Sequence, residues 1–161
     1  LPHGVPSDKK VESGEFVLMD FGATYDGWHS DMTRTVCVGK PSDKMESVYE
    51  TVLTAQLSAL DAVKAGMSGK GLDKIARDII TEAGYGDNFG HSLGHGVGVE
   101  IHESPYASPS REDILPENSI VTVEPGIYLE GKFGVRIEDF VVVTENGCIN
   151  MTKAPKELIC L

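Results

Sequence analysis

The sequence has few cysteines and no long apolar run. It has three cysteines, Cys37, Cys148 and Cys160. This number is small for a disulfide scaffold, and because it is odd the cysteines cannot all form pairs. Free thiols favour a reducing compartment, so we expect a cytoplasmic protein in which these cysteines have no chemical role. No apolar stretch approaches the ~18 residues that a membrane span needs, and the first residues lack the pattern of a secretory signal. These absences exclude a disulfide-rich secreted domain and a membrane partner.

Positive charge is also scarce. Lysine and arginine together number 14 against 25 acidic residues, which gives a formal net charge of -11. Such a surface repels phosphate backbones, so we expect no nucleic-acid partner. Aromatic residues are 7% and hydrophobic residues 40% of the chain, as in ordinary globular proteins. No repeat or linker divides the sequence, so residues 1–161 are interpreted as a single domain.

Two kinds of hydrophobic periodicity occur in separate parts of the chain. Alternating or continuous apolar runs predict strands, and apolar residues three and four apart predict helices. Asp26-Gly27 predicts a tight hairpin turn, and Asp43 with Glu46 resembles a capping box at the start of a helix. The second helix is expected to face the core with Leu72, Ile75, Ile79 and Ala83 and to end at Gly84. The expected elements are a buried strand at 15–23, a strand at 28–38, a helix at 43–64, a helix ending at 84, strands at 119–129 and 133–144, and a last hairpin at 146–147. Antiparallel hairpins with segregated helices predict an α+β fold.

The first hairpin carries two aspartates. If Asp26-Gly27 forms the turn, Asp20 lies opposite Thr33, and Asp31 lies on the same face of the ribbon. A turn shifted by one residue would place the two aspartates directly opposite each other. In either register, two like charges point the same way, and such a pair shares a proton or holds a cation. The open alternative is a solvated face on which the aspartates bridge to Arg34 or to lysines.

A second hairpin repeats this pattern beside a histidine-rich segment. Glu124 and Glu138 interrupt apolar strands, and a loop centred on Gly131 places them opposite each other. His95 lies in a glycine-rich run. Four carboxylates and an imidazole form a hard ligand set that suits Mn²⁺, Fe²⁺, Co²⁺ or Zn²⁺. Two such ions about 3.5–4 Å apart would generate a hydroxide near neutral pH. Alternatively, His91, His95 and His102 are ordinary core or surface histidines.

Several short strings, in order and at matching spacing, resemble those of one enzyme family. They are Asp-Phe-Gly at 20–22, Ser-Asp-Met-Thr-Arg-Thr at 30–35, Gly-His-Gly-Val-Gly at 94–98, Ile-His-Glu at 101–103, Val-Glu-Pro-Gly at 123–126 and Gly-Val-Arg-Ile-Glu-Asp at 134–139. This pattern resembles the pita-bread metallopeptidases, which include aminopeptidase P, prolidase and methionine aminopeptidase. The resemblance runs from Pro2 essentially to the C-terminus. It implies a pita-bread fold, an antiparallel β-sheet core with flanking helices. It also implies that these residues are a C-terminal catalytic segment, without the N-terminal domain and the start of the catalytic fold.

The resemblance also implies a role for each site residue. The site would hold two divalent metal ions, with manganese as the first choice and cobalt, zinc or iron as alternatives. One ion would be bound by Asp20 and the other by His95 and Glu124, and Asp31 and Glu138 would bind both. A hydroxide between the metals would be the nucleophile. His91 and His102 would contact the substrate carbonyl and the tetrahedral intermediate, and Glu124 would shuttle a proton. His3 would lie at the pocket mouth, with Tyr128 and Arg136 in a supporting network.

The proline-specific branch of the family is the more similar one. Arg34, the Arg-Ile-Glu-Asp string at 136–139 and Pro2-His3-Gly4 resemble prolidase and aminopeptidase P. The implied function is hydrolysis of the Xaa-Pro bond at the N-terminus of dipeptides or short peptides. The implied partners are peptides with proline at the second position, and the resemblance allows a homodimer. The alternatives are a methionine aminopeptidase, a non-catalytic pita-bread binding module and an inactive fragment.

Overall fold

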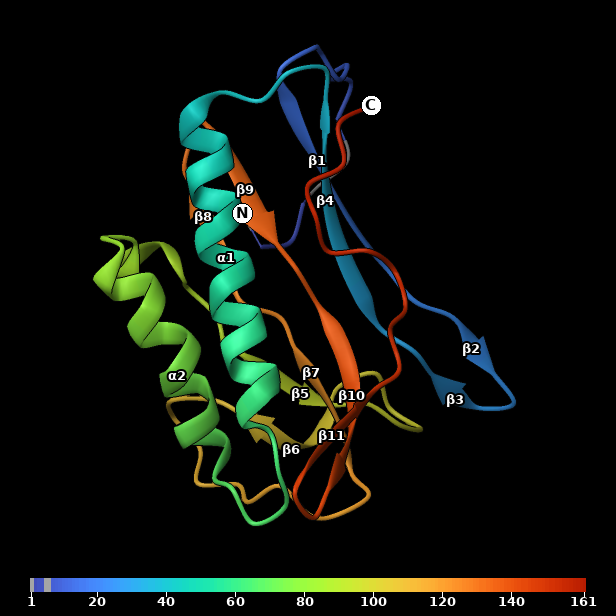
Figure 1. Ribbon diagram of the computed structural model, residues 1–161. Helices are drawn as coiled ribbons and strands as arrows, with labels where there is room; N and C mark the ends of the chain where they lie inside the picture. The colour runs from blue at the N-terminus through green and yellow to red at the C-terminus, as the bar shows by residue number, and fades with distance from the viewer. Residues whose placement is uncertain (1, 5–6) are drawn as a thin grey trace.

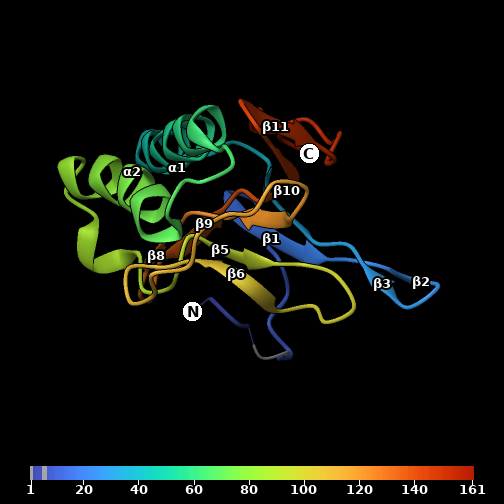
Figure 2. The same ribbon diagram turned by 90° about the horizontal axis from the view of Figure 1, so that it is seen from below.

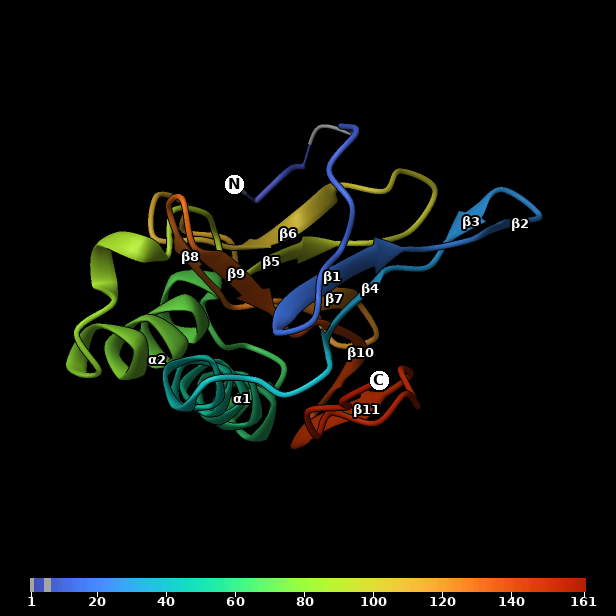
Figure 3. The ribbon, with the colours of Figure 1, turned by 90° about the horizontal axis from the view of Figure 1, so that it is seen from above.

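The computed structural model describes residues 2–4 and 7–161. Helices α1 (Asp43–Ala62) and α2 (Gly69–Glu82) lie side by side, and the strands of the described residues pair antiparallel. Seen from below and from above, both helices lie on one side of the strands and the N-terminal segment lies on the opposite side (Figures 2 and 3). The predicted α+β class is therefore confirmed. Within the described ranges, neither helix combines the length and apolarity needed to cross a bilayer.

The first hairpin has the predicted turn and register. Strand β1 (Glu15–Phe21) pairs with β4 (Met32–Val38), and Asp20 lies opposite Thr33. The short strands β2 (Thr24–Tyr25) and β3 (Trp28–His29) are joined by Asp26-Gly27, both with positive φ, as a two-residue hairpin turn of the primed type requires. The alternative register, with the turn shifted by one residue, is wrong.

Two expectations for this hairpin need correction. The predicted strand at 28–38 is interrupted at 30–31, where the chain passes so close to Gly22 that a Cβ there would lie 1.9 Å from the carbonyl oxygen of Ser30. Strand β1 is only half-buried at residues 15–18 and is exposed at residues 19–21. Among the described residues it pairs only with β4, so its other edge stays open. Met19 and Phe21 are 37% and 54% exposed.

Both helices begin at serine caps. The side chain of Ser42 accepts a hydrogen bond from the Met45 amide at the start of α1, so the cap lies one residue before the predicted Asp43. Helix α2 is capped by Ser68 in the same way. The prediction for its core-facing side is confirmed for Leu72 and wrong for Ala83, which is exposed, while Ile75 and Ile79 are half-buried. The fully buried residues of the helix are Gly69, Leu72, Asp73, Ala76 and Ile80. A short 3-10 helix, η1 (Gly86–Asn88), follows.

A five-stranded sheet packs against the helices. Its order is β11 (Gly147–Asn150), β10 (Asp139–Thr144), β7 (Ile120–Val123), β5 (Gly94–Gly96) and β6 (Glu103–Ala107). Buried side chains of α1, α2 and this sheet form the core, among them Val52, Leu72, Val121 and Val141. Strands β8 (Gly126–Leu129) and β9 (Phe133–Arg136) form a separate two-stranded ribbon.

The predicted register of the second hairpin is confirmed, but the ladder has a gap. Val123 pairs with Asp139 and Gly126 pairs with Arg136, so one register holds on both sides of Glu124. The two glutamates do not pair with each other in the ladder. The Glu124 amide donates to the Leu93 carbonyl at 2.8 Å, and the Glu138 amide donates to the Thr33 carbonyl at 3.0 Å. The gap thus joins the second hairpin to β4 on one side and to the segment before β5 on the other.

Candidate active site

One pocket of about 240 Å³ brings together all five predicted metal ligands. The strands that carry them meet near the middle of the molecule (Figure 3). These predicted ligands come from β1, the β3–β4 link, β5, the β7–β8 link and the β9–β10 link, and they are Asp20, Asp31, His95, Glu124 and Glu138. The predicted substrate-side residues His3, His91, His102 and Arg136 line the same pocket.

Three of these ligands form a tight cluster. Asp31, His95 and Glu138 each offer one ligand atom, and these atoms all lie within 4.8 Å of one another. The three residues are 8%, 8% and 2% exposed. Two carboxylates and an imidazole at this separation fit a divalent ion with a preference for nitrogen and oxygen.

The imidazole of His95 is oriented for metal binding. Its Nδ1 donates to the carbonyl oxygen of Gly96 at 3.0 Å, which leaves the Nε2 lone pair directed into the pocket. Nε2 lies 3.2 Å from Oε1 of Glu124 and 3.8 Å from Oδ2 of Asp31. Glycine precedes His95 because β5 runs against β7, and a Cβ at Gly94 would lie 1.9 Å from a β7 carbonyl oxygen.

The carboxylates of the cluster repel one another in a partly dry site. Burial, followed by the charge of Asp20, raises the pKa of Asp31 from 3.8 to about 6. Burial and the charges of Glu124 and Asp31 raise the pKa of Glu138 well above its usual value. The one strong local compensation at Glu138 is the Thr33 hydroxyl, which donates to Oε2 at 2.5 Å. A divalent cation would relieve this repulsion, so the donor set fits the predicted metal.

Asp20 lies at the edge of the pocket, outside the tight cluster. Its carboxylate accepts a hydrogen bond from the guanidinium of Arg136, which is 3% exposed. Arg136 also donates to the Tyr128 hydroxyl at 2.9 Å and to the Thr33 hydroxyl at 3.1 Å. The solvated alternative is therefore wrong for Asp31, which is 8% exposed, whereas Asp20 is exposed and pairs with an arginine. The predicted partner Arg34 is not involved, because it pairs with buried Asp139 at 2.7 Å.

His91 has both ring nitrogens engaged. Nδ1 donates to the Ser92 carbonyl at 2.8 Å, and Nε2 accepts from the Tyr128 hydroxyl at 2.9 Å. Burial lowers the pKa of His91, so the ring is neutral and of fixed tautomer near neutral pH. Its predicted contact with substrate stays a prediction.

The other two predicted histidines lie toward solvent. His102 is exposed, and its ring packs edge-on against that of His95, with centroids 4.3 Å apart. Partial burial and the neighbouring His95 lower the pKa of His102. His3 is exposed at the pocket edge.

Sequence reasoning missed an ion pair on α2. Asp73 is 1% exposed and pairs with Arg77, which also holds the backbone of the segment before β5. The only sequence signal was the spacing of four residues. Lys74 and Asp78, which are exposed, share that spacing on the same helix.

Comparison with known proteins identifies the family. The sequence profile of metallopeptidase family M24 matches residues 1–145. An Xaa-Pro dipeptidase of Pyrococcus furiosus is 55% identical over 159 residues, which are 99% of this chain and 46% of that protein. An uncharacterized peptidase of Bacillus subtilis is 55% identical over 161 residues, again 46% of its length.

Solved structures agree with the sequence matches. An Xaa-Pro dipeptidase from Bacillus anthracis has a TM-score of 0.98 at 54% identity, over 100% of this chain and 45% of that one. An X-Pro aminopeptidase from Thermotoga maritima has a TM-score of 0.96 at 53% identity, with the same coverage. The predicted pita-bread fold is therefore confirmed, and the chain spans slightly under half the length of these relatives. The chain belongs to metallopeptidase family M24, a family of peptidases that depend on divalent metals.

Proposed function

We propose that the protein hydrolyses the Xaa-Pro bond at the N-terminus of dipeptides or short peptides. The observation that carries this proposal is the pocket in which four carboxylates converge on His95. Relatives at 55% and 54% identity that are named Xaa-Pro dipeptidases support the choice of bond. Residues 1–161 would form part of one catalytic domain of a longer enzyme of this type.

The metal centre would hold two divalent ions, with manganese as the first candidate. Asp31 and Glu138 would bind both ions, Asp20 would complete one site, and His95 with Glu124 would complete the other. Such ions would supply Lewis-acid polarisation of the scissile carbonyl and would lower the pKa of a bound water, so that a hydroxide nucleophile would be available near neutral pH.

The protein side chains would handle the substrate and its proton. His102, at the open side of the pocket, would donate a hydrogen bond where negative charge develops on the scissile carbonyl oxygen. Glu124 would hold a proton on its carboxylate and pass it to the departing proline nitrogen. That nitrogen carries no hydrogen in the peptide and cannot leave without gaining one. His3 would contact the substrate at the pocket mouth.

Two alternatives are less well supported. Methionine aminopeptidase is not favoured, because three of the four relatives described above are named for Xaa-Pro substrates. A non-catalytic binding module would have no need for the complete ligand set in this pocket. A homodimer and a cytoplasmic location stay predictions.

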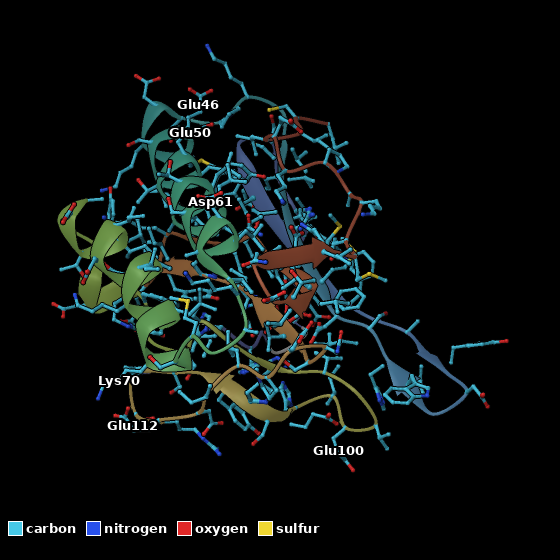
Figure 4. All side chains as sticks on the ribbon, turned by 60° about the horizontal axis from the view of Figure 1, so that its bottom comes forward. Glu46, Glu50, Asp61, Lys70, Glu100 and Glu112 are labelled. Atoms are coloured by element: carbon cyan, nitrogen blue, oxygen red, sulfur yellow. The ribbon has the colours of Figure 1, made fainter. Side chains whose placement is uncertain are left out.

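The test compares substrates and metals. Metal-stripped protein should be inactive, and Mn²⁺ should restore hydrolysis of Ala-Pro but not of Ala-Ala or Met-Ala. Including Ala-Pro-Ala separates a dipeptidase from an aminopeptidase. Asp31→Asn should remove activity, whereas Asp61→Asn, an exposed carboxylate on α1, should not (Figure 4). Activity that survives chelation, or cleavage of Met-Ala in preference to Ala-Pro, would contradict the proposal.

A further inference from the structure

Helix α2 contains two ion pairs between residues four apart, of which one is largely buried and the other is exposed to solvent. Arg77 binds Asp73 through two hydrogen bonds, Nε to Oδ2 at 2.7 Å and Nη2 to Oδ1 at 2.9 Å. The Asp73 side chain is 1% exposed and that of Arg77 is 26% exposed. Lys74 and Asp78 pair at the surface, where their side chains are 70% and 52% exposed. The chain therefore contains its own control for the effect of burial.

The guanidinium of Arg77 reaches beyond its partner on the helix. After α2 the chain turns through η1 and returns toward β5 (Figure 1). Arg77 donates to two carbonyls of this returning segment, to Phe89 through Nη1 at 2.9 Å and to His91 through Nη2 at 2.8 Å. It also lies 4.2 Å from the centre of the Phe89 ring. One planar group thus fixes the backbone on either side of residue 90.

Phe89 transmits this constraint to the imidazole of His91. The two rings meet edge-on, with centroids 5.1 Å apart and an angle of 89°. Nε2 of the same imidazole accepts a hydrogen bond from the Tyr128 hydroxyl at 2.9 Å. The His91 ring therefore contacts both a ring that Arg77 supports and a hydroxyl that Arg136 supports.

Asp73 anchors the end of the same segment. Its Oδ1 accepts the Leu93 amide at 3.0 Å, and the Leu93 carbonyl accepts the Glu124 amide at 2.8 Å. A buried ion pair adds little net stability, because desolvation offsets the attraction. A planar guanidinium that makes several hydrogen bonds does, however, fix the orientation of the groups that it contacts, and a lysine ammonium cannot reproduce this geometry.

We propose that Arg77, held by Asp73, is a positioning residue that sets the orientation of the His91 imidazole in the active site. This inference rests on the proposed function, in which His91 contacts the substrate. Arg77 itself does not line the pocket, so it acts through the segment that it holds.

The test uses Arg77→Lys, which keeps the charge next to Asp73 and removes the planar guanidinium. We expect kcat for Ala-Pro to fall about 10- to 100-fold, the loss typical of a misplaced reacting group, while KM and bound Mn²⁺ change less than twofold. Lys74→Met, on the same helix, should leave all three unchanged.

A double-mutant cycle separates positioning from general support of the fold. If Arg77 acts through His91, Arg77→Lys should lower kcat no further in a His91→Ala background. Equal losses in both backgrounds would overturn the proposal. Phe89→Leu removes the ring between the two residues and should also be non-additive with His91→Ala. If circular dichroism shows that Arg77→Lys does not fold, the cycle is measured with Phe89→Leu in place of Arg77→Lys.

A spectroscopic readout does not depend on activity. In the metal-free protein, the ¹⁵N shifts of the His91 ring should show a single Nδ1-H tautomer, and in Arg77→Lys they should move toward the average of two tautomers. Unchanged shifts would overturn the proposal. An inactive wild-type protein whose His91 shifts respond to Arg77→Lys would refute the proposed function and leave the positioning role intact.

Discussion

Replacing Asp31 with asparagine should stabilise the metal-free protein and at the same time prevent it from binding metal. Asp31 is 8% exposed, and its nearest basic partner among the described residues is Nε2 of His95 at 3.8 Å. Asparagine keeps the shape of the side chain and removes the charge that burial opposes. The variant therefore separates the free energy of unfolding from function at a single residue.

The pKa of Asp31 sets the size of the effect. Burial and neighbouring Asp20 raise it from 3.8 to about 6, so the folded state binds this proton more tightly than the unfolded state does. The stabilising contribution of the protonated form is complete below about pH 4 and is lost as the pH rises through about 6. A difference of about two pKa units corresponds to about 3 kcal/mol. At pH 7.5 the wild type has lost all of this contribution, whereas asparagine does not titrate.

Urea unfolding followed by circular dichroism measures this difference. In EDTA at pH 7.5, Asp31→Asn should raise the free energy of unfolding by about 1–3 kcal/mol, and near pH 4 the two proteins should be equal within about 0.5 kcal/mol. Mn²⁺ at 100 times its Kd should add about 2.7 kcal/mol to the wild type and nothing to the variant. Asp61→Asn, an exposed carboxylate, should change neither value. A variant that is less stable than wild type in EDTA at pH 7.5, or a gain of equal size at pH 4, would refute the reasoning.

Three further predictions concern the frame of the site. Gly94→Ala should lower the free energy of unfolding by about 3 kcal/mol or more, because the added methyl would lie 1.9 Å from a backbone oxygen; Gly90→Ala, which meets nothing within 4 Å, should be neutral in the same thermal melt. Ser42→Ala should cost about 1 kcal/mol in urea unfolding through loss of the α1 cap, and an altered affinity for Mn²⁺ would contradict a purely local effect. Tyr128→Phe should raise the pKa of His91, because the hydroxyl donates to Nε2 and so stabilises the neutral ring; an unchanged NMR titration would show that this hydrogen bond is not formed.

The sequence predicted the elements that depend on local geometry. A two-residue turn at Asp26-Gly27 determines which residues face each other and predicts Asp20 opposite Thr33, although the sequence also allowed a turn shifted by one residue. The register of the second hairpin followed in the same way from the loop at Gly131. Because side chains alternate between faces, each register grouped one pair of acidic residues, whereas the convergence of the two pairs on His95 was implied by the family resemblance and not by the registers.

Other features depend on contacts that a single sequence does not contain. Glu124 and Glu138 have the predicted register but leave the ladder, and Pro125, which has no amide hydrogen, lies at the gap. The ion pair between Asp20 and Arg136 forms because β1 and β9 are in contact, although they are more than a hundred residues apart in the sequence.

Burial was the property least accessible from pattern alone. Spacing cannot distinguish Asp73–Arg77 from Lys74–Asp78, because only the packing of α2 decides which pair is buried. For the same reason the apolar composition of β1 did not reveal that its last three residues are exposed.

The ladder gap in the second hairpin has an evolutionary consequence. Beyond Glu124 and Glu138 the strand pairing resumes in the same register. The register of β8 and β9 is therefore already set by the pairing of β7 with β10, and does not depend on the length of the turn that joins β8 to β9. Insertions or deletions in the turn at 130–132 would therefore leave Glu124 and Glu138 in place. A single-residue insertion between Val123 and Gly126 would move one of these glutamates relative to the other. Homologous enzymes should tolerate length variation at the tip of this arm and almost none at its base.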